Sequence, residues 1–289
     1  MLVPLKQIIA KAEKQNYAVG AFNTSNLEIS LAIIRGAVAA KAPVIIQTSE
    51  SAIKYSNLET IYNLMKILAN TIGKSVPIAI HLDHGKDLAV IRDCIKIGYQ
   101  SVHIDASEQV FANNLKLSQQ VVSLAHPKKV WVQAELGAIL GAEGMLKLKS
   151  GQIKMRDLMT DPDQAGIFVK KTKIDALAVS VGTIHGSFKG LEKVDQERLK
   201  KIRQNTKIPL VLHGGSGLPD QVFKQAIVNG VRIINIDTNL RIKFKDGINQ
   251  GLKTSQNKID PRQILTPAVL AMQAEVVRLA KVFGSFHKA

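Results

Sequence analysis

The chain has 289 residues, enough for one barrel-sized domain or two small ones, and 46% of them are hydrophobic, which suits a globular protein with a buried core. No apolar run approaches the roughly 18 residues that cross a membrane, and residues 1–17 lack the basic-then-apolar order of a signal peptide. The single cysteine, Cys94, excludes an internal disulfide, so we expect a cytoplasmic protein.

The net charge of +16 raises the possibility of a nucleic-acid-binding protein. The basic residues are mostly lysines, however, and they are spread along the whole chain without interleaved aromatic residues. This distribution favours solvated lysine surfaces, so we expect that no nucleic acid is required. A basic binder remains the alternative to an enzyme, and a positive field would also attract an anionic substrate.

Eight apolar, β-rich segments recur along the chain, each followed by a loop and a helix-like stretch. In order, they are residues 18–23, 44–49, 78–83, 101–106, 130–137, 176–182, 209–214 and 231–237. Alternation of this kind predicts an α/β fold, a closed (β/α)8 TIM barrel, and no linker divides residues 1–289 into two domains. Residues 265–284 predict an additional C-terminal helix, which we expect to form an oligomer contact in a homodimer or homotetramer.

Each predicted strand ends in a polar residue or a glycine. The strand ends are Asn23, Ser49, Asp83 with His84, Asp105, Glu135, Gly182, His213 with Gly214, and Asn235 with Asp237. The carboxyl ends of barrel strands meet at one face, where the active sites of this fold lie. We therefore expect these side chains to surround a substrate.

The stretch HLDHG, residues 81–85, is either a metal-binding corner or a strand end that happens to be polar. Two further histidines, His185 and His213, follow other predicted strands, and three imidazoles at one barrel face suit a catalytic Zn²⁺ together with His84. His81 and His103 lie deeper in their strands, so we expect hydrogen-bonded supporting roles for them. A metal hydrolase of the amidohydrolase type would need an H-x-H pair on the first strand, which is absent.

Two glycine-rich or helix-opening stretches are suited to binding phosphate. HGGSGLP (213–219) follows the seventh predicted strand, and NIDTN (235–239) ends the eighth and opens a helix. GTIHGSFKG (182–190) adds glycines and Lys189, and Arg241 lies one helical turn beyond Asp237. Because the loops after strands 7 and 8 commonly hold phosphate in this fold, we expect a phosphorylated substrate.

The motifs HLDHG, AELG, GTIHGSFKG, LHGGSG and NIDT occur in this order and span the whole chain. Together they resemble the class II, zinc-dependent fructose-bisphosphate aldolases, in the branch shared with tagatose-bisphosphate aldolases. The resemblance implies reversible cleavage of fructose 1,6-bisphosphate to dihydroxyacetone phosphate and glyceraldehyde 3-phosphate. It also implies one catalytic Zn²⁺ and a monovalent cation, K⁺ or Na⁺, beside the phosphate site.

The resemblance further implies roles for individual residues. The zinc ligands would be His84, His185 and His213, with Glu135 able to approach the metal when substrate is absent. Asp83 would act as acid and base at the C4 hydroxyl, and Glu143 would move the proton at the dihydroxyacetone phosphate carbon. The residues that would contact substrate or phosphate are Asn23, Ser49, Gly182, Lys189, Gly214, Ser216, Asn235, Asp237, Thr238 and Arg241.

Simpler roles remain open for three of these residues: Asp83 as a turn cap before Gly85, Glu143 as a solvated loop carboxylate, and Lys189 as a surface lysine. Two positions also depart from the family pattern. The family run NxDTD ends in aspartate, whereas this chain has Asn239 there, and Gln133 stands where glutamate is common. A tagatose-bisphosphate or related phospho-ketose aldolase is therefore an alternative. A Schiff-base aldolase would instead need a desolvated lysine inside the barrel.

Overall fold

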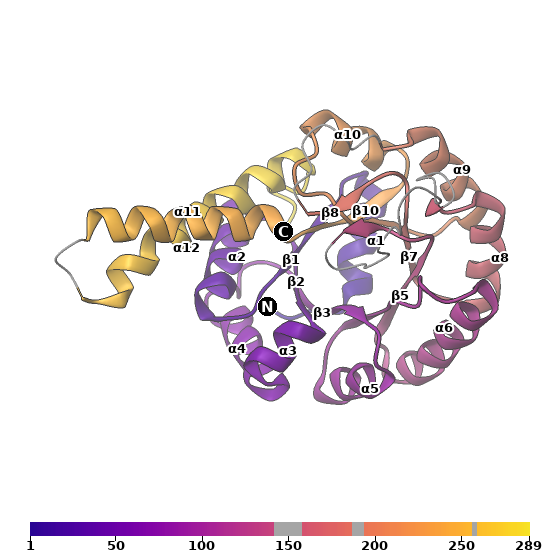
Figure 1. Cartoon of the computed structure of the whole chain (residues 1–289), viewed down its shortest axis with the longest axis horizontal. Coiled ribbons are helices and arrows are strands. Elements are labelled where there is room, and N and C mark those ends of the chain that lie inside the picture. The colour runs from indigo at the N-terminus through magenta and orange to yellow at the C-terminus, as the bar shows by residue number, and fades with distance from the viewer. Residues whose placement is uncertain (142–157, 187–193, 256–258) are drawn as a thin grey trace, which may run out of the picture.

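The computed structural model describes residues 1–141, 158–186, 194–255 and 259–289, and for residues 140, 141 and 185 it describes the backbone only. Eight parallel strands close into a barrel in the order β1-β10-β9-β7-β5-β4-β3-β2, which confirms the predicted (β/α)8 architecture (Figure 1). The barrel strands are β1 (Val19–Asn23), β2 (Val44–Ser49), β3 (Ile78–Gly85), β4 (Ser101–Ile104), β5 (Trp131–Leu136), β7 (Ala176–Val179), β9 (Leu210–Leu212) and β10 (Val231–Ile236). All eight fall within the segments predicted from the sequence or within two residues of them.

Helices surround the barrel and cover the outward faces of its strands (Figure 1). They are α1 (Leu5–Gln15), α2 (Leu27–Ala40), α3 (Glu50–Ser56), α4 (Leu58–Asn70), α5 (Leu88–Ile97), α6 (Phe111–Ala125), the 3-10 turn η1 (His126–Lys128), α8 (Pro162–Thr172), α9 (Gln196–Thr206), α10 (Asp220–Val228), α11 (Thr238–Thr254) and α12 (Pro261–Val282). Side chains at the strand-to-helix turns cap several of these helices. Asn26 accepts a hydrogen bond from the backbone of Ile29, and Ser49 accepts one from Ala52. A residue that ends a strand can therefore also begin a helix.

The interior of the barrel is apolar at the amino ends of the strands. Leu5, Ile8 and Ile9 of α1 close this end and pack against Trp131 and small or branched strand residues. Alternate residues of a strand point to the same side, so the next inward position on each strand lies one layer higher. That layer is polar, because Asn23 follows Ala21 in β1 and His213 follows Val211 at the end of β9.

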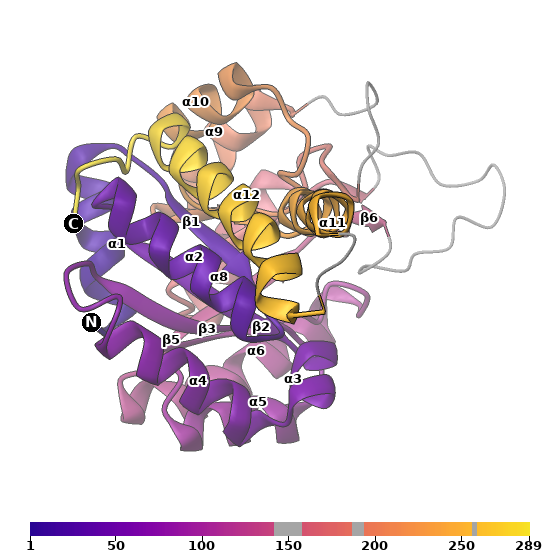
Figure 2. The ribbon, with the colours of Figure 1, turned by 90° about the vertical axis from the view of Figure 1, so that its left-hand side faces the viewer.

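Helices α11 and α12 form an antiparallel pair whose tip extends away from the barrel (Figure 1). Turned by 90°, the same pair is seen with α11 end-on beside α12, and both termini lie at the end of the barrel that α1 closes (Figure 2). α12 also packs against α2, where Gly36 admits the side chain of Val276. The predicted C-terminal helix is thus present. Within the described residues, no helix is both long and apolar enough to cross a membrane.

Candidate active site

Strand β3 ends in a bulge that turns its last residues toward the barrel axis. The pairing of β3 with β4 shifts between Leu82 and Gly85, and His84 has a left-handed φ of 46°. Gly85 is required there, because a Cβ would lie 2.6 Å from the carbonyl oxygen of His103. A left-handed backbone is costly for a residue other than glycine and is commonly retained at functional positions.

The imidazole of His84 is oriented by a carboxylate. Its Nδ1 lies 2.8 Å from Oδ2 of Asp105, and its Nε2 lies 3.0 Å from Nδ1 of His213. Burial acts to lower the pKa of His84, but the carboxylates of Asp83 and Asp105 outweigh burial and raise the pKa to about 10. A carboxylate that fixes one ring nitrogen leaves the other to bind a metal, which takes the place of the proton.

His213 is fully buried, and side-chain amides surround its second ring nitrogen. Its Nε2 lies 3.0 Å from Nε2 of Gln133 and 3.3 Å from Nδ2 of Asn235. The oxygen and nitrogen of an amide exchange places when the group turns by half a rotation. With the oxygen of Gln133 toward Nε2–H of His213, the lone pair of Nδ1 points toward His84.

Asp83 is a buried carboxylate held by two amides. Its Oδ2 accepts a hydrogen bond of 2.8 Å from Asn23, and its Oδ1 accepts one of 3.1 Å from Asn235. Gln47 in turn donates to the oxygen of Asn23. Burial acts to raise the pKa of Asp83, yet the surrounding imidazoles, that of His84 foremost, hold the pKa well below its usual range. Asp83 is therefore an ionised base directly beside the histidines.

A second group lies on the other side of His84. His103 and Glu135 are both buried, and Nε2 of His103 is 3.8 Å from Oε2 of Glu135. Among the described residues, neither of these two atoms has a hydrogen-bond partner. Burial, followed by the charge of Asp105, raises the pKa of Glu135 to about 8.

Two sets of side chains in this layer place one ligand atom each within 4.8 Å of one another: Asp83, His84 and His213, and His84, His103 and Glu135. Imidazoles and carboxylates are donors that a transition metal such as zinc prefers. The described side chains therefore fit a metal ion.

The glycine-rich loop after β9 and the start of α11 lie next to this cluster. Gly214 has a φ of 65°, and a Cβ on it would meet the backbone of Ile184 at 2.8 Å. Ser216 is buried, and its Oγ accepts a hydrogen bond from the backbone of Asn239. One pocket over the cluster is lined by Asn23, Asp83, His84, Gly186, His213, Gly214, Gly215, Ser216, Asn235, Asp237 and Thr238.

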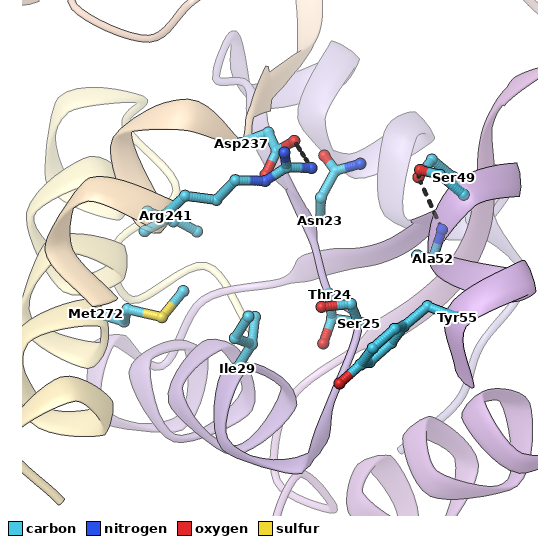
Figure 3. Close-up of a pocket in the computed structure, with 12 residues that line it drawn as sticks. Asn23, Thr24, Ser25, Ile29, Ser49, Ala52, Tyr55, Asp237, Arg241 and Met272 are labelled. Atoms are coloured by element: carbon cyan, nitrogen blue, oxygen red, sulfur yellow. Dashed lines mark hydrogen bonds and ion pairs between the residues drawn. The ribbon is translucent and has the colours of Figure 1, made fainter. Parts of the chain in front are cut away.

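A second pocket, of about 270 Å³, shares Asn23 and Asp237 with the first. Ser49 and Tyr55 lie on one side of it, and Arg241 lies on the other (Figure 3). Arg241 forms an ion pair of 2.5 Å with Asp237 across one helical turn. The guanidinium group of Arg241 therefore lies at the edge of this second pocket, next to Asp237.

Most of the residues singled out from the sequence are brought together by the barrel. Gly182 follows β7 with a φ of 100°, and His185 lies in β8 (Ile184–His185), which pairs with β6 (Leu140–Gly141), but the side chain of His185 is outside the described part. Glu143 and Lys189 also lie outside the described residues. Asp105, which orients His84, was predicted from the sequence only as a polar strand end.

His81 and His103 were expected to be hydrogen-bonded supporting groups. His81 meets this in part, because its Nδ1 lies 2.8 Å from the hydroxyl of Ser101 while its Nε2 has no partner among the described residues. His103 also meets it in part: its Nδ1 accepts a hydrogen bond of 3.3 Å from the backbone of His84, while its Nε2 has no partner among the described residues. Its ring lies beside those of His84 and His213, with centroids 5.0 and 5.2 Å away. The alternation of side chains along β3 and β4 indicates from the sequence that both rings point into the barrel.

Known proteins are similar to this chain in sequence and in fold. The model of the family described as "Fructose-bisphosphate aldolase class-II" matches residues 3–288. The chain belongs to this family. The fructose-bisphosphate aldolase of Geobacillus stearothermophilus is 39% identical over 289 residues, covering 100% of this chain and 99% of that protein. A fructose-bisphosphate aldolase of Helicobacter pylori (strain J99) is 36% identical, with 100% of both chains covered.

A solved structure with the same fold is that of the YdjI aldolase from Escherichia coli K12, with a TM-score of 0.86, 31% identity and coverage of 100% of both chains. The chain is accordingly a class II aldolase, a lyase that breaks a carbon–carbon bond. Class II aldolases are generally metal-dependent, and the histidine–carboxylate cluster can bind a metal. The family also implies a sugar bisphosphate as substrate.

Proposed function

We propose that this aldolase cleaves fructose 1,6-bisphosphate reversibly to dihydroxyacetone phosphate and glyceraldehyde 3-phosphate. The observation that carries the proposal is Asp83, an ionised carboxylate held by Asn23 and Asn235 directly beside His84 and His213. Relatives named fructose-bisphosphate aldolase, which match the chain from end to end, support the choice of sugar. We place the enzyme in the cytoplasm.

In this proposal His84, His185 and His213 hold one Zn²⁺, and Glu135 can approach it in the absence of substrate. When bound, the ion supplies a Lewis acid that stabilises negative charge on the oxygens of the substrate. The neighbours of the ligands support this assignment, because Asp105 orients His84 and Gln133 faces His213. A monovalent cation, K⁺ or Na⁺, beside the phosphate site completes the proposed cofactors.

Asp83 takes the proton of the C4 hydroxyl as the C3–C4 bond breaks. The electron pair of that bond moves to the dihydroxyacetone phosphate half as an enediolate, and C4 becomes the aldehyde carbon. The former C3 must then gain a proton, which we assign to Glu143 on the strength of the family resemblance. Asn23 and Asn235 keep the carboxylate of Asp83 in place for the first of these steps.

The phosphate of the dihydroxyacetone half is assigned to the glycine-rich loop, with Gly182, Lys189, Gly214, Ser216, Asn235 and Thr238 as its contacts. The start of α11 supports this assignment, because the N-cap residue Asp237 makes no capping hydrogen bond there and backbone N–H groups at a helix N-terminus attract anions. Ser49, Asp237 and Arg241 are assigned to the other end of the sugar, where they line the second pocket.

We also propose a homodimer or homotetramer. The extended pair α11–α12 supports it, because Ile242, Leu252, Ile259 and Leu270 on or between these helices are exposed. Sedimentation of the purified protein measures the assembly. A single species at the mass of one chain would refute it.

The decisive functional experiment compares kcat/KM for fructose and tagatose 1,6-bisphosphate in the presence of Zn²⁺. The two sugars differ in configuration at C4, whose hydroxyl Asp83 is proposed to deprotonate. We expect at least about a tenfold preference for the fructose substrate, because a misplaced reacting group costs this much or more. A preference for tagatose bisphosphate would assign the chain to the alternative substrate, and no turnover of either sugar would refute the proposal.

A further inference from the structure

Asn239, the second residue of α11, forms hydrogen bonds with two distant parts of the chain. Its backbone N–H donates to Oγ of Ser216 over 3.1 Å, and its side-chain Nδ2 donates to Oε1 of Glu275 over 2.7 Å. Glu275 belongs to α12, 36 residues further along the chain. A single asparagine therefore connects the glycine-rich loop to the C-terminal helix.

Glu275 is itself fixed. It is 7% exposed, and Arg278 donates from Nε to Oε2 and from Nη2 to Oε1, each over 2.9 Å. The remaining Nη1 of Arg278 donates over 2.8 Å to Asp220, the first residue of α10. Bidentate bonds of this type combine charge with a defined geometry. Because α10 begins directly after the loop HGGSGLP, Arg278 anchors the far end of the same loop.

The hydroxyl of Ser216 has one proton to donate and lone pairs with which to accept. Since it accepts from the backbone of Asn239, its own proton remains available for an acceptor in the pocket over the cluster. The hydrogen bond from the backbone of Asn239 limits the directions in which that proton can point.

We propose that Glu275, held by Arg278, is a positioning residue that sets Asn239 and, through it, Ser216 for binding of a substrate phosphate. The identity of the phosphate rests on the proposed function. The contacts among Ser216, Asn239 and Glu275 do not depend on that function. Glu275 and Arg278 act through Asn239 and need no contact with the substrate.

Asn239 and Glu275 are complementary as hydrogen-bond donor and acceptor. The amide of Asn239 donates to a carboxylate, whereas an aspartate at position 239 would bring a second negative group to the same oxygen of Glu275. Like charges in contact repel, and the donor would be lost as well. Exchanging the two groups, with aspartate at 239 and glutamine at 275, restores one donor and one acceptor.

The test uses the full-length, zinc-loaded protein and the variants Asn239→Asp, Glu275→Gln and the double variant. For Asn239→Asp we expect KM for fructose bisphosphate and Kd for dihydroxyacetone phosphate to rise about tenfold, with kcat within about threefold of the wild type. Glu275→Gln keeps an acceptor for Asn239 but weakens its hold by Arg278, so its KM rises about threefold. The double variant returns to within about threefold of the wild-type KM.

Hydrogen–deuterium exchange of residues 213–219 provides a readout that needs no turnover. We expect faster exchange of this loop in Asn239→Asp and slower exchange again in the double variant. Asn63→Asp on α4 and Glu197→Gln on α9 make the same chemical changes at exposed positions and serve as controls. Should Asn239→Asp fail to fold, Glu275→Gln and the double variant give the same comparison.

Unchanged KM, Kd and loop exchange in Asn239→Asp would overturn the proposal, as would a double variant that is no better than the single one. A lower melting temperature with unchanged KM would reduce the contact to a structural one. If wild-type protein fails to cleave fructose bisphosphate, the proposed function falls, and the loop exchange alone decides the positioning role.

Discussion

The two halves of the barrel interior are built from the same strands but have opposite chemistry. At the amino ends, Trp131 and Ile45 pack against helix α1 in an apolar cluster. Two residues further along β5 and β2, Gln133 and Gln47 belong to a buried polar layer that contains the histidines. Among the described residues, the polar layer holds buried titratable groups with atoms that lack hydrogen-bond partners, such as Oε2 of Glu135 and Nε2 of His103.

This difference separates stability from catalysis along a single strand. Burying apolar groups stabilises the fold, whereas burying polar groups without partners costs free energy. The polar layer therefore has to be explained by what binds to it, and the apolar layer does not. Substitutions in the two halves should consequently differ in what they change.

The largest expected effect is that of His84→Ala in the polar half. Loss of this imidazole should remove the bound metal and lower kcat/KM for fructose bisphosphate by at least about 1,000-fold, because the Lewis acid is lost with it. Metal analysis and steady-state kinetics measure both quantities. His126→Ala, whose ring pairs with Asp175 on the outside of the barrel, is the matched control and should keep its metal.

Asp83→Ala should separate proton transfer from metal binding. We expect metal to remain and kcat to fall by about 100- to 10,000-fold, the usual range for loss of a general base. Asp93→Ala, at an exposed position of α5, should leave kcat unchanged. Wild-type kcat in Asp83→Ala would remove Asp83 from its proposed role.

A smaller effect is expected of Gln133→Leu, which removes the group that faces Nε2 of His213. Metal affinity should fall about tenfold, because partners of metal-bound imidazoles commonly contribute 10- to 100-fold. Competition with a chelator of known affinity measures it. Affinity equal to that of the wild type would show that His213 does not depend on Gln133.

The smallest effect on catalysis should come from the apolar half. Ile9→Ala in α1 opens a cavity under the barrel and should lower the free energy of unfolding by about 2–4 kcal/mol. The folded variant should keep wild-type kcat/KM, as should the exposed control Gln7→Ala. A selective loss of kcat in Ile9→Ala, without loss of stability, would break the distinction between the two halves.

The eight strands could be predicted because strands buried on both faces are continuous apolar runs. The mouth of the barrel could be predicted for a related reason, since polar residues end those runs at one face. Neither prediction required knowledge of a contact between particular side chains.

The pairings inside the site could not be predicted in this way. The contact of Asp105 with His84 depends on the bulge at Gly85, and a shift in register is not visible in the composition of a strand. The departure from the family pattern at Asn239 acquires a physical reason only when Glu275, far along the chain, is seen beside it. That the chain forms one domain from end to end remains a prediction.

The central claim is that a metal held in the polar layer is required for cleavage of fructose 1,6-bisphosphate. It is tested most directly by measuring bound zinc and cleavage rate together, before chelation, after chelation and after Zn²⁺ is returned. We predict that activity falls in proportion to the zinc removed and returns with it, while the protein stays folded. Full cleavage activity in metal-free protein would contradict the account.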